Sequence, residues 1–167
     1  MKKLFAVAAL AVAVFAGTAL AGLPISKVDK VAPTDEIFMD MATTAATKAV
    51  ASKGKPCGAV IILNNAWKAT GTANANGTAE QNAIAKSGLA SLRNATVFTV
   101  NEPTTEAYND ICAFGADAVV FVNGRDAVVA NGIYPAEAYD DAKIDSTRTL
   151  VPLKQMDFPD AAALLKK

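Results

Sequence analysis

Apolar and polar positions follow two different periods along this chain, and together they predict alternating helices and strands. Segments with the apolar spacing or the start and stop signals of helices are 35–53, 78–90, 104–115, 125–131 and 158–167. Short apolar or β-branched runs that predict strands are 59–63, 67–72, 95–100 and 118–122, followed by an extended segment at 149–153. The run 59–63 is apolar throughout, which is typical of a strand buried on both faces.

The order of these elements, α-β-β-α-β-α-β-α-β-α, predicts an α/β fold. We expect a three-layer α-β-α sandwich in which helices cover both faces of a central mixed sheet. Residues 35–167 have the length of one ordinary domain. The preceding segment, 22–34, contains two prolines and little periodicity, so we expect an N-terminal arm or linker there.

The first 21 residues have the features of a secretory signal peptide of Gram-negative type. Lys2 and Lys3 precede an apolar run, and small residues follow just before Gly22. The alternative is a membrane anchor, but the run is short for a hydrocarbon core of about 30 Å. We therefore expect cleavage before Gly22 and a periplasmic or secreted protein with no membrane segment after cleavage.

Charge and histidine content narrow the classes of function. The chain has 16 basic and 16 acidic residues and no histidine. A near-neutral protein lacks the basic surface that binds phosphate backbones, so we expect no nucleic-acid partner. Without histidine, the commonest metal ligand and the commonest general base are both missing. Cys57 and Cys112 could form a disulfide in an oxidising compartment or remain two buried free thiols.

Two short motifs at predicted helix starts carry the candidate chemistry. The first is Thr78-Ala79-Glu80, and the second runs from Glu102-Pro103 to Ala107. Zinc-dependent nucleobase deaminases have His-x-Glu at the first place and Pro-Cys-x-x-Cys at the second. Two cysteines three positions apart at a helix N-terminus lie on one face and meet the histidine of the neighbouring helix. That arrangement holds a tetrahedral zinc ion with one open position.

With these motifs and the segments around them, the chain resembles the cytidine-deaminase-like superfamily, in particular the guanine deaminases and the tRNA adenosine deaminases. The matching segments between residues 35 and 167 are FMDMA, KPCGAVIIL, GTAEQNAI, TVFTVNEPTTEAY, GADAVVFV, NGRDAVVANGI and TRTLVPLKQM. The resemblance implies a cytidine-deaminase-like fold. It also implies a homodimer.

The resemblance further implies a zinc site whose ligands are missing in this chain. Thr78 stands at the position of the family's histidine, and Thr104 and Ala107 stand at those of its two cysteines. We therefore expect no zinc and no other cofactor. Zinc lowers the pKa of its bound water from about 15.7 to about 7, so its loss removes roughly 12 kcal/mol of nucleophile activation. Glu80 is retained at the proton-shuttling position, but general-base help contributes only about 10²–10⁴-fold.

The candidate ligand-binding residues, which surround the former zinc site, are Cys57, Asn74, Asn76, Thr78, Glu80 and Thr104. Glu80 is also the candidate catalytic acid or base. An alternative gives Glu80 a structural role in a filled-in site and makes the two threonines helix caps. Tyr134 and Tyr139 are weaker ligand candidates, and Glu106 is expected to face solvent.

Three functions remain open on this sequence. The first is an exported pseudoenzyme that does not catalyse deamination and binds a nucleobase-like or other small planar ligand. The second is a structural or interaction module with a filled-in site. The third is an enzyme, either a metal-independent hydrolase that uses Glu80 or a residual nucleoside deaminase. The sequence favours the first, with a small molecule as the partner.

Overall fold

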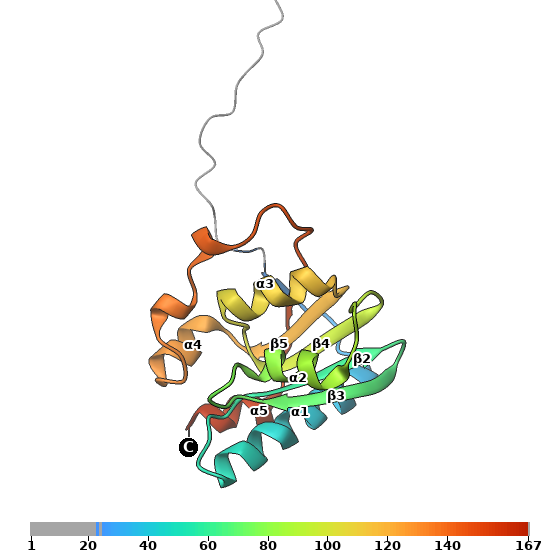
Figure 1. The fold of residues 1–167 in the computed structure, drawn as a ribbon. Helices are drawn as coiled ribbons and strands as arrows, with labels where there is room; N and C mark the ends of the chain where they lie inside the picture. Colours follow the sequence, from blue (N-terminus) through green and yellow to red (C-terminus); the bar gives the residue numbers. More distant parts are fainter. Residues whose placement is uncertain (1–22, 24, 167) are drawn as a thin grey trace, which may run out of the picture.

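The computed structural model describes residue 23 and residues 25–166, which form a six-stranded mixed sheet covered by helices (Figure 1). In order across the sheet, the strands are β1 (Ile25–Lys27), β6 (Leu153–Gln155), β5 (Ala118–Asn123), β4 (Ala95–Asn101), β2 (Gly58–Leu63) and β3 (Ala66–Thr72). The first four run parallel to one another, whereas β2 is antiparallel to both β4 and β3. The predicted mixed sheet is confirmed.

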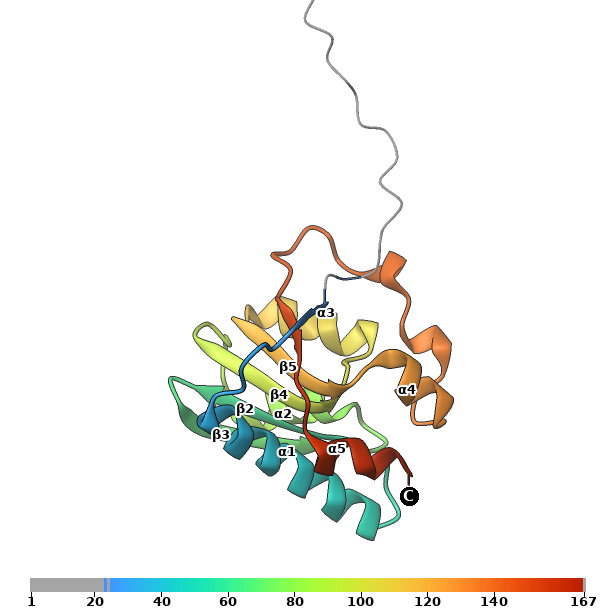
Figure 2. The same cartoon turned by 180° about the vertical axis from the view of Figure 1, so that it is seen from behind.

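Helices cover both faces of this sheet. On one face lie α1 (Pro33–Ala51) and α5 (Pro159–Ala163); on the other lie α2 (Ala79–Ser87) and α3 (Thr105–Phe114), as Figures 1 and 2 show. α4 (Arg125–Ala130) follows β5 directly. Short 3-10 helices lie at Ala136–Ala138, Asp141–Lys143 and Leu164–Lys166. The predicted three-layer α-β-α sandwich is confirmed.

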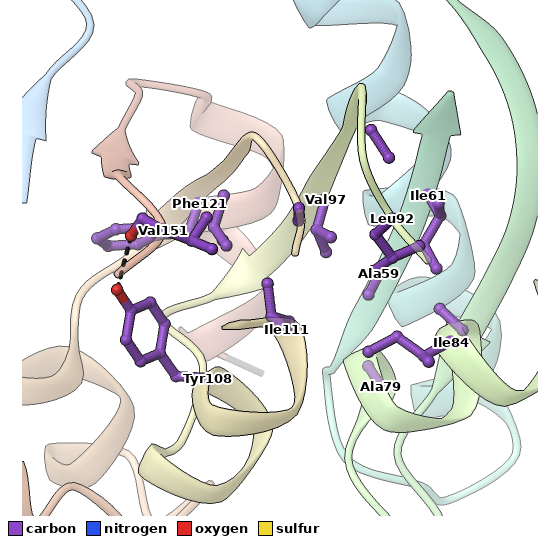
Figure 3. Packing of buried hydrophobic residues seen from close by; sticks show 14 of the residues in the cluster. Ala59, Ile61, Ala79, Ile84, Leu92, Val97, Tyr108, Ile111, Phe121 and Val151 are labelled. Carbon is purple, nitrogen blue, oxygen red and sulfur yellow. Dashed lines mark hydrogen bonds between the residues drawn. The ribbon is translucent and has the colours of Figure 1, made fainter. Parts of the chain in front are cut away.

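Each face of the sheet has its own hydrophobic core. Along β2 the side chains alternate: Ala59 and Ile61 belong to the cluster beneath α2 and α3, whereas Val60 and Ile62 belong to the cluster beneath α1 and α5. Figure 3 shows the first cluster, in which the Tyr108 hydroxyl donates a hydrogen bond of 2.6 Å to the Val151 carbonyl. β2 is therefore buried on both faces, which its continuous apolar run predicted.

Two glycines allow helices to lie directly on the sheet. A Cβ atom on Gly58 of β2 would sit 2.1 Å from the carbonyl oxygen of Ala42 in α1. A Cβ atom on Gly71 of β3 would sit 2.1 Å from the carbonyl oxygen of Ala79 in α2. Any larger residue at either position would push the helix away from its strand. Gly71 therefore fixes the position of the first turn of α2, which carries the first motif.

Helix boundaries differ from the predicted ones by a few residues. α1 begins at Pro33, with Ala32 as its N-cap residue, rather than at residue 35, and ends at Ala51 rather than at residue 53. Proline suits the first helical position because its φ is fixed and the N–H group it lacks would have no partner there. α2 ends at Ser87 rather than at residue 90, because Gly88 adopts the left-handed conformation with φ of 64°.

The N-terminal arm is more regular than its composition indicates. The segment expected to be an N-terminal arm or linker, 22–34, contains β1, which pairs with β6 at the edge of the sheet. A strand of three residues is too short to show a period-two pattern. The C-terminal strand is also displaced: it spans 153–155 instead of 149–153, since Pro152 has no N–H group to donate to a neighbouring strand.

The sequence also predicted a signal peptide at the N-terminus and left open a disulfide between the two cysteines. The predicted signal peptide, residues 1–21, lies outside the described residues. Across residues 25–166, no helix combines the length and apolar character needed to cross a bilayer. Cys57 and Cys112 are both free and buried, so the two thiols do not form the disulfide that the sequence left open.

Candidate functional site

The two motifs lie at the N-termini of α2 and α3, where threonine hydroxyls satisfy free backbone N–H groups. The Thr78 Oγ1 atom accepts a hydrogen bond of 3.3 Å from the N–H of Gln81, and the Gln81 side chain accepts one of 3.0 Å from the N–H of Thr78. This reciprocal pair is a capping box. Thr104 Oγ1 accepts a hydrogen bond of 3.3 Å from the N–H of Ala107 and so caps α3. Both hydroxyls are engaged as helix caps.

Glu80, in the first turn of α2, has only 4% of its surface exposed. The Thr99 hydroxyl of β4 donates a hydrogen bond of 2.5 Å to Glu80 Oε1. Burial raises the pKa of Glu80 above its ordinary value of 4.5, and the hydrogen bond from Thr99 opposes part of that rise. The Glu80 carboxyl therefore keeps its proton to a higher pH than an exposed glutamate does.

A second buried polar group, the Cys57 thiol, lies against the last residue of β4. The Asn101 amide donates hydrogen bonds of 3.3 Å to Cys57 Sγ and 3.0 Å to the Pro56 carbonyl. Asn123, the last residue of β5, donates one of 3.1 Å to Asn101 Oδ1. Burial raises the pKa of the Cys57 thiol to about 11, and the charge of Glu80 adds to the rise. At neutral pH this thiol is protonated and a poor nucleophile.

Two neighbouring surface clefts open beside the capped helix ends. The larger, with a volume of about 650 Å³, is lined by residues 53–55, residues 73–78, Gln81, Glu106 and Tyr134. The smaller, with a volume of about 430 Å³, is lined by Thr78, residues 104–106, Asn109, Tyr134, Glu137, Ala138, Asp140 and Lys143. Three residues, Thr78, Glu106 and Tyr134, line both clefts. The two clefts are therefore adjacent and share a wall.

The structure brings four of the six candidate ligand residues to the walls of these clefts. Asn74, Asn76 and Thr78 line the larger cleft, and Thr104 lines the smaller one together with Thr78. The remaining two candidates, Glu80 and Cys57, are buried and line neither cleft. Four of the candidates are therefore accessible from the clefts, and two are buried polar side chains.

The two weaker candidates, Tyr134 and Tyr139, differ in position, and so does Glu106, which was expected to face solvent. Glu106 is exposed, yet it lines both clefts and accepts a hydrogen bond of 3.3 Å from the Gln81 amide. Tyr134 lines both clefts as well. Tyr139 lines neither, and its hydroxyl donates a hydrogen bond of 3.1 Å to the Glu102 carbonyl.

An ion-pair network anchors the C-terminal segment that carries these tyrosines. The Glu102 side chain, 2% exposed, accepts hydrogen bonds of 2.9 Å from the backbone N–H of Arg125 and 2.7 Å from its guanidinium. Arg125 also pairs with Asp141 at 3.0 Å and lies over the Tyr139 ring, 5.6 Å from its centroid. Burial alone would lower the pKa of Arg125, but the hydrogen bond to Glu102 outweighs this and raises it. We had assigned no role to Arg125 from the sequence.

Comparison with known proteins identifies the family. The sequence model for the cytidine and deoxycytidylate deaminase zinc-binding region matches residues 32–123, more than half of the chain. The chain belongs to this deaminase family. The match extends from the start of α1 to the end of β5 and includes both capped helix N-termini. A comparison with curated protein sequences finds no match.

Solved structures of other deaminases share the fold. A protein solved in complex with 2,6-diaminopurine has a TM-score of 0.68 at 18% identity, over 82% of each chain. The guanine deaminase from Nitrosomonas europaea has a TM-score of 0.64 at 19% identity, over 82% of this chain and 84% of its own. The guanine deaminase from Bacillus subtilis has a TM-score of 0.58 at 22% identity, over 78% of this chain and 90% of its own. These likenesses establish the cytidine-deaminase-like fold.

The residues at the deaminase family's zinc positions do not fit a zinc ion. Thr78 and Thr104 present neutral hydroxyls that already accept backbone hydrogen bonds, and Ala107 has no donor atom. Zinc in proteins is held by thiolate, imidazole and carboxylate groups. The described part of the chain contains no group of three or more Cys, Asp or Glu side chains that could hold a metal ion. The donors that zinc requires are therefore missing at this position.

The hydrogen-bond partners of the Glu80 carboxyl and the Cys57 thiol were not predicted from the sequence. Thr99, Asn101 and Asn123 are polar residues within or at the end of strands that are otherwise apolar, and all three are buried. A polar residue in a strand predicted to be buried must find a hydrogen-bond partner. That requirement was the available signal, and it points to the carboxyl ends of β4 and β5.

Replacing Glu80 with glutamine should change how stability depends on pH. Because burial raises the pKa of Glu80 in the folded protein, its contribution to stability is fully present below the ordinary pKa of 4.5 and is lost as the pH rises through the folded pKa. Glutamine resembles the protonated carboxyl and does not titrate. We expect the free energy of unfolding of Glu80→Gln, measured by urea denaturation, to increase relative to wild type between pH 5 and pH 8.

Glu137→Gln is the matched control, because the same substitution is made at an exposed residue. Its difference from wild type should stay constant across the same pH range. If Glu80→Gln loses stability relative to wild type as the pH rises, the folded protein prefers the ionised Glu80 and the assignment of a raised pKa is wrong.

Proposed function

We propose that this protein is a deaminase-family member that has lost zinc-dependent catalysis and binds a small planar ligand, such as a nucleobase, in the clefts beside the former metal site. One observation carries the proposal. The side chains at the three zinc positions are two helix-capping hydroxyls and one methyl group. They cannot supply the histidine and two thiolates that the family's chemistry requires.

The loss of catalysis follows from the size of the missing effect. Zinc provides roughly 12 kcal/mol of nucleophile activation by acidifying its bound water. Glu80 alone would supply general-base help of about 10²–10⁴-fold, equivalent to roughly 3–5 kcal/mol. Glu80 is also buried and lines neither cleft, and among the described residues no group of side chains that could hold a metal ion lies beside it to activate a water molecule. Neither a residual deaminase nor a hydrolase based on Glu80 is favoured.

The walls of the larger cleft support the binding of a small polar ligand. They carry the side-chain amides of Asn74, Asn76 and Gln81, which can both donate and accept hydrogen bonds. The Lys55 ammonium lies 4.5 Å from the centroid of the Tyr134 ring and adds a charged donor beside an aromatic face. The volume of the larger cleft, about 650 Å³, lies in the range of small-molecule sites. Proteins with this fold have been solved with 2,6-diaminopurine and with 8-azaguanine.

A second candidate function is a structural or interaction module with a filled-in site. The observation in its favour is that Thr78, Thr104 and Glu80 all have internal hydrogen-bond partners. A site satisfied in this way can persist without a ligand. Ligand binding separates the two candidates.

Purified protein should not bind zinc. We expect elemental analysis after incubation with zinc and gel filtration to find far less than one ion per chain, because the donor set is missing. The matched control is the triple variant Thr78→His, Thr104→Cys, Ala107→Cys, which restores the family's ligands. That variant should bind one zinc ion per chain. One zinc ion per chain in the wild type would overturn the proposed loss of catalysis.

Nucleobases should stabilise the protein against heat. We expect guanine, 2,6-diaminopurine, 8-azaguanine or a related heterocycle to raise Tm by roughly 5–10 °C at a concentration of about one hundred times Kd, without turnover detectable by chromatography. Lys55→Ala should reduce the shift, whereas Lys68→Ala, an exposed lysine on β3, should not. If no nucleobase, nucleoside or other small heterocycle shifts Tm, the interaction module becomes the better explanation.

We also propose that the protein is exported and works as a periplasmic or secreted homodimer. The charged start, the apolar run and the small residues before Gly22 support export, and the deaminase family supports the dimer. Mass spectrometry of protein from the periplasmic fraction should give a chain that begins at Gly22. Light scattering of the same sample should give twice the mass of that chain. An uncleaved chain in the cytoplasm would contradict export, and a monomer would contradict the dimer.

A further inference from the structure

Tyr134 occupies the space between the two clefts. It lines both of them, and its ring packs against the hydrophobic core cluster beneath α2 and α3. Its pKa is raised by burial, with contributions from Cys57 and Glu80, which places the Tyr134 hydroxyl near both buried groups. Tyr134 thus lines both clefts, and its hydroxyl is close enough to Cys57 and Glu80 for their charges to act on its pKa.

The Tyr134 hydroxyl is buried without a hydrogen-bond partner among the described residues, and its oxygen is the one such side-chain atom found there. The Cys57 thiol, whose sulfur is only a weak acceptor, is the group beside it. Buried polar groups in proteins nearly always have a partner, so an unpartnered hydroxyl marks a place where another molecule can provide one.

The segment around Tyr134 is fixed at both ends but not at Tyr134 itself. On one side, the Ile133 N–H donates a hydrogen bond of 3.1 Å to the Val128 carbonyl at the end of α4. On the other side, Tyr139 is held by the Glu102 carbonyl. Within the described chain, no hydrogen bond involves the main chain or the side chain of Tyr134. Packing and the contact with Lys55 hold the ring, so its displacement would break no hydrogen bond of the described chain that fixes its neighbours.

We propose that the two clefts are the two ends of one ligand site, that the Tyr134 ring fills its middle, and that a planar ligand binds by taking the place of this ring beside Glu80 and Cys57. The inference rests on the proposed ligand-binding function and adds how the site opens. The ligand class is an uncharged flat heterocycle with hydrogen-bond donors at its edge, because it must replace an aromatic ring and meet the Glu80 carboxyl. Tyr134 then determines which ligands bind, because every ligand must displace it.

Thiol labelling tests this arrangement without any ligand. Cys57 and Cys112 are both buried, but only Cys57 lies beside Tyr134. We expect iodoacetamide at pH 8 to modify Cys57 in Tyr134→Ala at least about tenfold faster than in wild type, measured by peptide mass spectrometry. A thiol pKa that falls from about 11 to 9.0 would alone raise the thiolate fraction by about 100-fold. Cys112 should keep its wild-type rate and serves as the internal control.

Tyr134→Leu is the second variant, in case the loss of the whole ring unfolds the protein. Leucine preserves apolar packing against the core but leaves the middle of the site open. Cys57 should again react faster than Cys112. If either variant is folded and Cys57 stays as protected as in wild type, the ring does not cover Cys57 and the inference is wrong. If Cys57 and Cys112 become reactive together in both variants, Tyr134 only stabilises the fold and the inference is also wrong.

Ligand titration distinguishes this inference from the proposed function. With 2,6-diaminopurine as the probe in calorimetry, we expect Tyr134→Ala to bind at least about tenfold more tightly than wild type, because no ring must be displaced. Equal affinities in the two proteins would contradict displacement but leave ligand binding intact. Selective exposure of Cys57 without binding of any heterocycle to either protein would support the position of the ring and refute the proposed function.

Discussion

Backbone N–H groups at the start of a helix need acceptors, and in this protein two threonine hydroxyls provide them at α2 and α3. The fold places these two helix ends beside the same pair of clefts. In the deaminase family, side chains at these positions hold zinc. A hydroxyl that accepts a backbone hydrogen bond stabilises its helix and is not among the groups that hold zinc in proteins. Under the proposed function, Thr78 and Thr104 keep the helix ends in place without the family's metal. The other features of the site follow from this exchange.

Under the proposed function, Glu80 no longer takes part in the reaction that the corresponding glutamate serves in zinc deaminases. In a zinc deaminase, the glutamate moves a proton between zinc-bound water and the base. Here its carboxyl is buried, and its partner is the Thr99 hydroxyl, at 2.5 Å. The raised pKa of Glu80 reduces the electrostatic penalty of burial, because a neutral carboxyl is easier to bury than a carboxylate. The same raised pKa makes the carboxyl a hydrogen-bonding group for a neutral ligand that reaches it.

The α/β sandwich was predictable from the sequence because every central strand is a short apolar run between turn signals, and every long helix has apolar spacing. The three-residue strands at the sheet edge were not, since 25–27 and 153–155 are too short to carry a period. At the site, the motifs at 78–80 and 102–107 predicted which helix ends meet. Contacts between distant segments were not predictable in the same way. The position of Tyr134 depends on how the residues after α4 return across the sheet, and no local pattern encodes that path.

The buried polar groups argue for a ligand and against a filled-in site. An unpartnered hydroxyl in a protein interior costs about 1–3 kcal/mol, and a buried carboxyl adds a further penalty. A domain that needed only its fold would be more stable with phenylalanine at 134 and an apolar residue at 80. Both polar groups are present instead, and Tyr134 lies in the wall that the two clefts share, with the Cys57 thiol beside its hydroxyl. Their joint cost is explained if a polar heterocycle meets them there, whereas a structural role explains the caps at Thr78 and Thr104 but not the unpartnered hydroxyl.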